Sequence, residues 1–535
     1  MFAHRFAARP ARMFLYLFFS APMLRSWLLP AVLLVLFFSL SQAAQAGTGF
    51  AGLTPGPYGI GFRVVQQYDY ARSYKEKTDA VTGKPYLGER ARPVQTLVWY
   101  PAQKGGSPLH YADYVRTEAT DEVFGQTEAQ VASYLAGQQQ GMASAVGPKQ
   151  AQALLDQRMW AVANAPATTG KFPVVLYAAG GGSVAHEAAD LCEYLASHGY
   201  VVLASRSLGT RTSQMNFDEE GLATQAADIR FLLSYAHTLP QADMAHVAAA
   251  GWSWGGLANA LAASQDSRIG ALVSFDGTKA REDTKPVVRL RLTVPWLYVQ
   301  RRSESVRELS AKGMETTGIL LNEAKYADLY HVIMNPMVHV DFSTKALRVA
   351  QPEHFTEYSR AEIEAAYQWT CRYTLEFLNA TLKGNAAGQQ FLARTPTQNG
   401  LPAHMALSYH LPAQPGPMPT QAGFAAALAQ EGFEHALAIY RRVQQQDAAF
   451  ALSEMDLNSW GYQLIREAHD VPTAVAIFQL GTELYPSSFN LFDSLGEADE
   501  LNHNATAAIT HYQRSLELNP QNSHAQQRLQ ALHTK

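Results

Sequence analysis

The sequence has no excess of positive charge and no long apolar run near its start. Its 42 Lys and Arg residues stand against 46 Asp and Glu, so the balance gives no reason to expect a nucleic-acid partner. The apolar stretch Trp27–Leu40 has 14 residues and contains Pro30, whereas a membrane-spanning helix needs about 20. With 47% hydrophobic and 16% charged residues, the chain has the composition of a globular protein. Its 535 residues exceed what one core usually organises, so we expect two domains.

Residues 1–46 are typical of a signal peptide. Arg25 precedes the apolar stretch, and Ala44-Gln45-Ala46 has the small-x-small pattern of a cleavage site. Cleavage after Ala46 predicts a periplasmic or secreted protein, and an uncleaved membrane anchor is the less favoured alternative. Removal of this segment takes away four arginines and no acidic residue, which leaves 38 basic and 46 acidic residues and a net charge of −8. The translation start is left open between Met1, Met13 and Met23.

The chain has only two cysteines, Cys192 and Cys371, each in an apolar-patterned helical segment. An exported protein can form disulfides, and the fold expected below places the two segments on the same side of the sheet. A bridge would close a loop of about 180 residues and contribute about 4–5 kcal/mol by chain entropy. Two buried free thiols, acting as small hydrophobic side chains, are the slightly favoured alternative.

Strand-like and helical segments alternate along the chain, which predicts an α/β fold with a mostly parallel eight-stranded sheet and helices on both faces. The predicted strands are Phe62–Tyr70, Val94–Tyr100, Val174–Ala178, Val201–Ser205, Val247–Gly251, Ala271–Phe275, Trp296–Gln300 and Tyr330–Met334. Residues 103–170 are rich in Gln and Ala and helical in pattern, for example over Glu128–Gln140 and Lys149–Val162. Because a bare loop of this length is uncommon, we expect a helical cap there, or alternatively a peripheral insertion with no role at the site.

Composition changes after a predicted helix over Arg360–Leu382. Residues 386–420 contain so much Gly, Pro and Gln that we expect a linker, which ends a catalytic domain of residues 47–385. Residues 421–535 contain an internal repeat with the 34-residue period of the tetratricopeptide repeat: Ala474, Phe478 and Pro486 recur as Ala508, Tyr512 and Pro520. The segment 422–446 can supply a third helical layer. The repeats are expected either to bind a protein partner or to stabilise or dimerise the chain.

The hexapeptide GWSWGG, residues 251–256, contains the pattern G-x-S-x-G. A small apolar strand precedes it and a helix rich in Ala and Leu follows, which is the context of a nucleophile elbow. The glycines remove side chains that would collide in so sharp a turn. Ser253 is therefore the candidate nucleophile, and the amide of Trp254 is expected to face the oxygen of a bound carbonyl.

The remaining site residues follow in the order that an α/β hydrolase requires. The loop after the third strand, YAAGGGS, contains Gly180–Gly182, whose backbone can approach a substrate closely. Asp276 ends the sixth strand and is the candidate orienting acid. Glu304 follows the seventh strand among arginines and is the less favoured candidate. His339 follows the last strand, in the loop that this fold directs at the serine, and is the candidate base.

Other chemistries lack the residues that they need. No lysine follows the glycines in the position of a phosphate-binding P-loop, and the G-x-G-x-x-G spacing is absent. The segment HEAAD, residues 186–190, resembles half of a zinc-binding helix but lacks the second histidine. We expect no metal and no cofactor.

The chain resembles the platelet-activating-factor acetylhydrolases and the related bacterial predicted dienelactone hydrolases over residues 55–380. The similar segments are, in order, PGPYGIGFR, TLVWYPA, FPVVLYAAGGG, LASHGYVVLA, GWSWGG, SFDG and VHVDFS. This resemblance implies an α/β-hydrolase fold with nucleophile, acid, base and oxyanion-hole amides at Ser253, Asp276, His339, Gly181 and Trp254. The chain departs from members with acetylhydrolase activity by having Ala179-Gly180 in place of their common His-Gly, which leaves the substrate open. The C-terminal segment resembles the repeat extensions of exported bacterial serine hydrolases.

These features predict an exported serine hydrolase that cleaves a small-molecule or lipid-like carboxylic ester through an acyl-enzyme. The alternative is a non-catalytic scaffold whose repeats bind a partner. A complete serine, acid and histidine set in the proper order argues against that alternative. Because every candidate catalytic group precedes the linker, a chain that ends near residue 385 is expected to remain active on small soluble esters.

Overall fold

The computed structural model describes residues 49–79, 82–277, 292–303, 324–414, 419–448 and 450–534. The predicted signal peptide and Glu304 lie outside these residues. Among the helices of the described ranges, none combines the length and apolar composition needed to cross a membrane.

Strands in the described ranges form one sheet in the order β11-β10-β9-β8-β7-β5-β6-β2-β1-β4-β3. From β6 to β10 the neighbouring strands are parallel, whereas β2 pairs with both β6 and β1 in antiparallel fashion. Each of the eight predicted strands is present, but the sheet in the described ranges has eleven strands, because β3, β4 and β11 extend it at its two edges. The bounds of the eight predicted strands are β1 Gly59–Ser73, β2 Ala91–Ala102, β5 Phe172–Ala178, β6 Val201–Ser205, β7 Ala242–Trp252, β8 Ala271–Phe275, β9 Trp296–Arg301 and β10 Leu329–Met334.

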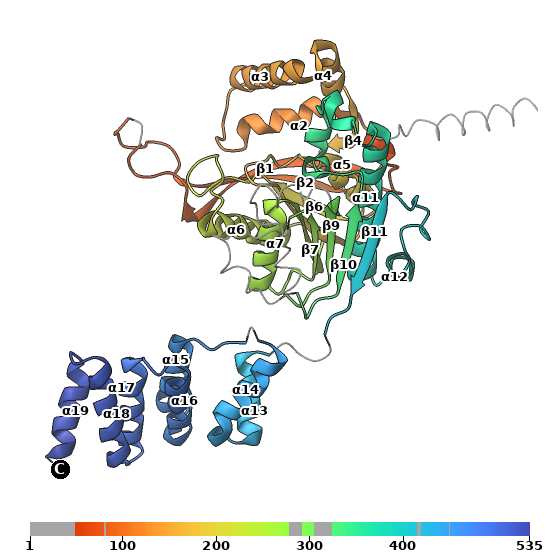
Figure 1. Cartoon of the computed structure of the whole chain (residues 1–535). Helices are drawn as coiled ribbons and strands as arrows, with labels where there is room; N and C mark the ends of the chain where they lie inside the picture. The colour runs from red at the N-terminus through yellow and green to blue at the C-terminus, as the bar shows by residue number, and fades with distance from the viewer. Residues whose placement is uncertain are drawn as a thin grey trace, which may run out of the picture.

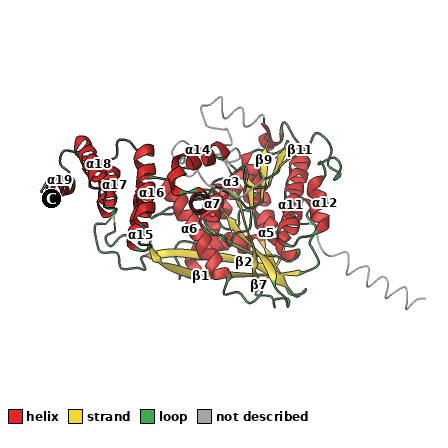
Figure 2. Ribbon diagram, turned by 90° about the horizontal axis from the view of Figure 1, so that it is seen from below, coloured by secondary structure: helices red, strands yellow, loops and turns green. Residues whose placement is uncertain are grey.

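Helices cover both faces of this sheet (Figures 1 and 2). One core cluster joins the sheet to α5 and α11, and a second joins the opposite face to α6 and α7. All residues of β5 and β8 are buried, as expected for central parallel strands that are covered on both sides. The helices are α5 Ala189–Ser197, α6 Glu219–Ala236, α7 Trp254–Gln265, α10 Thr344–Arg348, α11 Arg360–Leu382, with 3-10 turns η1 Phe50–Gly52, η4 His339–Phe342 and η5 Pro352–Phe355.

The predicted helical cap is only partly helical. Residues 103–170 contain β3 Pro108–His110, α2 Tyr111–Thr117, η2 Glu118–Thr120, α3 Glu128–Val146, α4 Pro148–Leu155 and β4 Arg158–Ala163. The helix predicted over Lys149–Val162 therefore ends at Leu155. Buried Met159 and Ala161 alternate with more exposed neighbours, which is the period of a strand. Strand β4 pairs in parallel with β1 and extends the sheet.

The prediction of a linker over residues 386–420 is wrong for its first part. Helix α12 (Ala386–Ala393) packs on α11, with the rings of Phe391 and Tyr373 4.9 Å apart. Strand β11 (Ala406–Leu411) pairs antiparallel with β10 over its whole length. The Gly- and Gln-rich composition hid these elements, because α12 contributes one large buried side chain and β11 lies at the edge of the sheet.

The C-terminal residues form a row of helices apart from the sheet (Figure 1). These are α13 Gln421–Glu431, α14 Ala436–Gln446, α15 Glu454–Arg466, α16 Val471–Leu484, α17 Phe489–Leu501, α18 Ala505–Leu518 and α19 Ser523–His533. Phe478 and Tyr512, which occupy repeated positions, each pack against a glycine: a Cβ on Gly461 would lie 2.3 Å from the Phe478 ring, and one on Gly496 would lie 2.8 Å from the Tyr512 ring. A glycine opposite an aromatic ring thus allows close packing in each of two helix pairs. Their identification as tetratricopeptide repeats stays a prediction.

Both cysteines lie in the core cluster that joins α5 and α11 to the sheet, and both are free thiols. The structure therefore has no bridge between Cys192 and Cys371, in agreement with the favoured alternative of two buried free thiols. Burial raises the pKa of both thiols above their ordinary value, so they are protonated at neutral pH.

Because β11 belongs to the sheet, the catalytic unit can be truncated after β11 but not before it without loss of stability. A chain that ends at Gln414 keeps β11 and α12, so we expect its melting temperature to stay within about 3 °C of that of the same unit in the full chain. A chain that ends near residue 385 loses both elements and exposes the edge of β10, and we expect it to melt at least about 5 °C lower. Circular dichroism melts of the two truncated chains make the comparison, and equal melting temperatures would contradict it.

Candidate active site

The turn between β7 and α7 places Ser253 at the carboxyl end of a central strand. Ser253 has φ 54° and ψ −125°, a backbone conformation that residues with a Cβ rarely adopt. Its amide donates a hydrogen bond to the Phe275 carbonyl oxygen at 3.0 Å. A Cβ on Gly255 would lie 2.2 Å from the Ala178 carbonyl oxygen, and one on Gly251 would lie 2.7 Å from the same atom. The two glycines of the motif thus let β5 approach the turn.

Ser253, His339 and Asp276 lie in hydrogen-bond contact. His339 Nε2 is 2.8 Å from Ser253 Oγ, and His339 Nδ1 is 2.6 Å from Asp276 Oδ2. The three residues follow β7, β10 and β8, whose parallel arrangement brings their carboxyl ends to one edge of the sheet. The Asp276 side chain is fully buried and that of His339 is 31% exposed. An imidazole in this position can take a proton from the hydroxyl while the carboxylate accepts its Nδ1–H.

The two tryptophans beside Ser253 have different surroundings. Trp252 Nε1 donates a hydrogen bond to the His339 carbonyl oxygen at 2.8 Å, and the Trp252 ring lies 5.1 Å from the imidazole. Trp252 therefore supports the position of His339. The Trp254 ring packs edge-on against Phe217, with 5.3 Å between ring centroids.

Arg301 was not predicted from the sequence as a site residue. Its Nε donates a hydrogen bond to Asp276 Oδ2, the oxygen that also faces His339, and its backbone amide lies 3.4 Å from Oδ1. The signal that could have indicated it is its position at the carboxyl end of β9, the strand next to the one that Asp276 follows. A buried carboxylate needs charged or polar partners, and Arg301 is one that stabilises the ionised form.

The loop after β5 presents one free amide between two that are bound. Gly180 donates its N–H to Glu187 Oε1 at 3.0 Å, and Gly182 donates to Ser207 Oγ at 3.4 Å. The Gly181 amide has no acceptor among the described residues. A Cβ on Gly181 would lie only 3.3 Å from the Trp254 Cβ. Trp254 follows Ser253 directly and is the first residue of α7, so its amide lacks a helical acceptor. The Gly181 backbone therefore lies beside Trp254, the residue next to Ser253.

An apolar wall lies beside these amides. The Phe217 ring is so close to Gly181 that a Cβ there would lie 2.3 Å from it. Phe217 is nevertheless 46% exposed, so part of the ring is open to solvent.

The insertion before β5 contacts the elements behind this loop. Glu118 accepts hydrogen bonds from Lys345 and Tyr134 and lies 2.7 Å from His186 Nε2. Burial by itself raises the pKa of Glu118, but His186 and Lys345 lower it to about 2. These contacts tie the insertion to α10, which follows His339. Its role as a cap stays a prediction.

The HEAAD segment has partners of its own. His186 faces Glu118, and Asp190 accepts two hydrogen bonds from the buried Arg348 guanidinium. In the part of the chain that the structure describes, no group of three or more His, Cys, Asp or Glu side chains is arranged to hold a metal ion.

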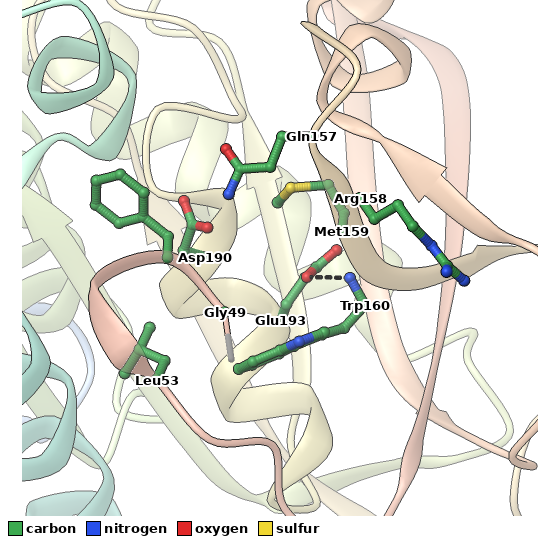
Figure 3. Close-up of a pocket in the computed structure, with 9 residues that line it drawn as sticks. Gly49, Leu53, Gln157, Arg158, Met159, Trp160, Asp190 and Glu193 are labelled. Carbon is green, nitrogen blue, oxygen red and sulfur yellow. Dashed lines mark hydrogen bonds between the residues drawn. The ribbon is translucent and has the colours of Figure 1, made fainter. Parts of the chain in front are cut away.

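Figure 3 shows a pocket beside the first half of α5, where the N-terminal segment Gly49–Leu53 meets β4. Its cavity volume is about 10 Å³, room for about one water molecule. Glu193 lies at this pocket and accepts the Trp160 amide at 2.8 Å. The pocket is too small for an organic substrate.

Comparison with known proteins gives a family match for part of the chain. Residues 130–293 match a family model described as Chlorophyllase, an α/β-hydrolase-like family. The matched range includes the Gly180–Gly182 loop, Ser253 and Asp276, and it ends before His339. A search of curated proteins finds no match. Among solved structures, a ferulic acid esterase from Streptomyces cinnamoneus matches with 18% identity and a TM-score of 0.46, covering 66% of this chain and 96% of that one.

The close packing around Ser253 makes Gly277, the residue after Asp276, sensitive to substitution. A Cβ there would lie 2.3 Å from the Ser253 carbonyl oxygen, so we expect Gly277→Ala to lower the free energy of unfolding by about 1–3 kcal/mol. Gly270 directly precedes β8, the strand that ends just before Asp276 and Gly277. A Cβ on Gly270 would lie 3.6 Å from its nearest neighbour, which is an ordinary contact distance. Gly270→Ala is therefore the matched control, with an expected change below about 1 kcal/mol. Urea unfolding measures both variants, and equal losses would contradict the proposed crowding.

Proposed function

We propose that this chain is an exported serine hydrolase that cleaves carboxylic esters through an acyl-enzyme. The observation that carries the proposal is the continuous chain of hydrogen bonds from Ser253 Oγ through His339 to Asp276. The family-model match over residues 130–293 is independent support for ester hydrolysis.

In the acylation step, Ser253 Oγ attacks the ester carbonyl carbon while His339 Nε2 takes the hydroxyl proton. The carbonyl oxygen becomes an oxyanion and accepts hydrogen bonds from the amides of Gly181 and Trp254. Asp276 stabilises the imidazolium. The bond to the alcohol then breaks, and His339 gives its proton to the leaving oxygen.

In the deacylation step, His339 takes a proton from water, and the resulting hydroxide attacks the acyl carbon. The second tetrahedral intermediate uses the same two amides. Its collapse breaks the bond to Ser253 Oγ, which regains a proton from His339 and releases the carboxylic acid. Every group in this cycle comes from the chain itself or from water.

The substrate proposed is a small-molecule or lipid-like ester. Phe217, exposed beside the oxyanion amides, supports an apolar group near the carbonyl. A series of p-nitrophenyl esters from acetyl to palmitoyl measures how long an acyl chain is accepted. For the C-terminal helices we propose tetratricopeptide repeats that bind a protein partner or a second copy of the chain, on the evidence of the 34-residue period.

The assignment of the orienting acid predicts a large loss of kcat when Asp276 is replaced by its amide and no loss when Glu304 is replaced by its amide. Asp276→Asn is expected to lower kcat by about 10⁴, because an amide favours the wrong imidazole tautomer. Glu304→Gln is the control and should leave kcat within about twofold. Steady-state kinetics on p-nitrophenyl acetate measures both. An active Asp276→Asn enzyme beside an inactive Glu304→Gln enzyme would overturn the assignment.

The proposed export predicts a mature chain that begins at Gly47. Gly49 packs so tightly that a Cβ there would lie 2.3 Å from the Trp160 ring, and Phe50 lies 4.4 Å from the Arg348 guanidinium. The cleavage site after Ala46 thus lies shortly before Gly49, where the described part of the chain begins and is already packed. Intact-mass measurement of protein from the periplasm or medium tests this, and an N-terminus at any of the candidate starting methionines would contradict it.

A further inference from the structure

Glu187 is a fully buried carboxyl directly behind the loop that carries the oxyanion amides. Its Oε1 accepts hydrogen bonds from the Gly180 amide and from the Tyr177 hydroxyl, both at 3.0 Å. Gly180 immediately precedes Gly181, whose amide the proposed reaction uses. The carboxyl group therefore determines the direction of the peptide that begins the oxyanion loop.

The backbone of the same residue holds the segment that follows His339. The Glu187 carbonyl oxygen accepts the Lys345 amide at 3.1 Å, the Thr344 hydroxyl at 3.1 Å and the Ser343 hydroxyl at 3.4 Å. Glu187 thus contacts both the oxyanion loop and the histidine-bearing segment. None of its contacts is with Ser253, so it acts through other residues.

We propose that Glu187 is a positioning residue: its carboxylate fixes the oxyanion loop through the Gly180 amide, and its protonation loosens that loop and slows ester hydrolysis. The inference rests on the proposed function, because it assigns a pH dependence to the proposed oxyanion hole.

The physical reason is the strength of the hydrogen bond from Gly180. A carboxylate is a charge-assisted acceptor, and such bonds are roughly twice as strong as neutral ones. Protonation makes the carboxyl a weaker acceptor for the amide, and an amide that turns away from Glu187 also turns its neighbour Gly181. Loss of one oxyanion donor costs about 10²–10³ in kcat, which sets the upper limit of the effect.

The pKa of Glu187 lies near neutral pH. Burial raises its pKa to about 7, and the hydrogen bonds from Ser183, Gly180 and Tyr177 limit the rise. The titratable groups that face it are Tyr177 from β5, Cys192 from α5 and Lys345 from α10. The pKa values of Tyr177 and Cys192 lie above their ordinary values, so both stay neutral. Lys345 is the cation that favours the carboxylate.

Glu193, six residues further along, offers a matched control (Figure 3). It is also buried, and burial raises its pKa to about 7 as well. Its oxygens accept the Tyr114 hydroxyl and the amides of Trp160 and Ala161, all within the insertion. Glu193 thus shares the chemistry of Glu187, but these hydrogen bonds are with the insertion and not with the oxyanion loop.

The test compares Glu187→Gln, Glu193→Gln and the wild-type full chain by kcat/KM on p-nitrophenyl acetate at pH 8.5 and pH 5.5. At pH 8.5 the wild type is expected to exceed Glu187→Gln about tenfold, mostly in kcat, because a neutral acceptor replaces a charged one. At pH 5.5 the wild-type carboxyl is itself neutral, and the ratio should fall to about one to two. The ratio of wild type to Glu193→Gln should not change between the two pH values.

Thermal melts check that stability does not explain the difference. Each folded-state pKa is raised above the unfolded value, so each carboxyl stabilises the fold at low pH and loses that contribution as the pH rises through about 7. Both Gln variants should therefore gain melting temperature relative to the wild type on going from pH 5.5 to pH 8.5. The proposal is supported if both variants show this change in melting temperature and only Glu187→Gln shows a change in kcat.

Two results would overturn it: a ratio of wild type to Glu187→Gln that is the same at both pH values, or equal losses in the two Gln variants. If Glu187→Gln does not fold, the pH profile of the wild type provides the test. The fall of kcat/KM at acid pH must then depend on the uptake of two protons, and a dependence on one proton rejects the role. A wild type without esterase activity at any pH would instead reject the proposed function, so the two failures are distinguishable.

Discussion

The backbone conformation of Ser253 is the constraint on which the rest of the site depends. A residue at φ 54° between a strand and a helix is strained, and it persists because the surroundings hold it. The Ser253 amide donates to the Phe275 carbonyl oxygen, the Ser253 carbonyl oxygen accepts the Gly256 amide, and Gly277 has no Cβ where one would collide with that oxygen. The turn lifts the hydroxyl out of the sheet edge toward His339 and starts α7 at Trp254, so a single turn positions both the hydroxyl and one oxyanion amide.

Buried charges surround this turn, and each is held by specific partners. Asp276 lies between His339 and Arg301, and the Gly180 amide and Tyr177 hydroxyl bind Glu187. Removing one partner of a buried charge costs more than the pair contributes, so these groups specify the site geometry more than they add stability. Arg301 donates to the Asp276 carboxylate, whereas burial raises the pKa of the Glu187 carboxyl to about 7.

The sequence was sufficient to predict the central strands, the turn at Ser253 and the order of Asp276 and His339. Those features depend on local patterns: continuous apolar strands, glycines at a sharp turn and polar residues at strand ends. The roles of Arg301 and Glu187 could not be predicted in that way, because each depends on which strand or loop is its neighbour in space. Strand β11 was missed for a related reason, since an edge strand with exposed side chains lacks the apolar signal of a central one.

The measurement that tests the central claim most directly is labelling of the folded full chain with a fluorophosphonate, followed by peptide mass mapping. The reagent reacts with a serine whose hydroxyl is activated by an adjacent base and whose oxyanion is stabilised. The account predicts one adduct per chain, on Ser253, and its loss in His339→Ala. An unlabelled folded protein, or an adduct on a different serine, would contradict the account.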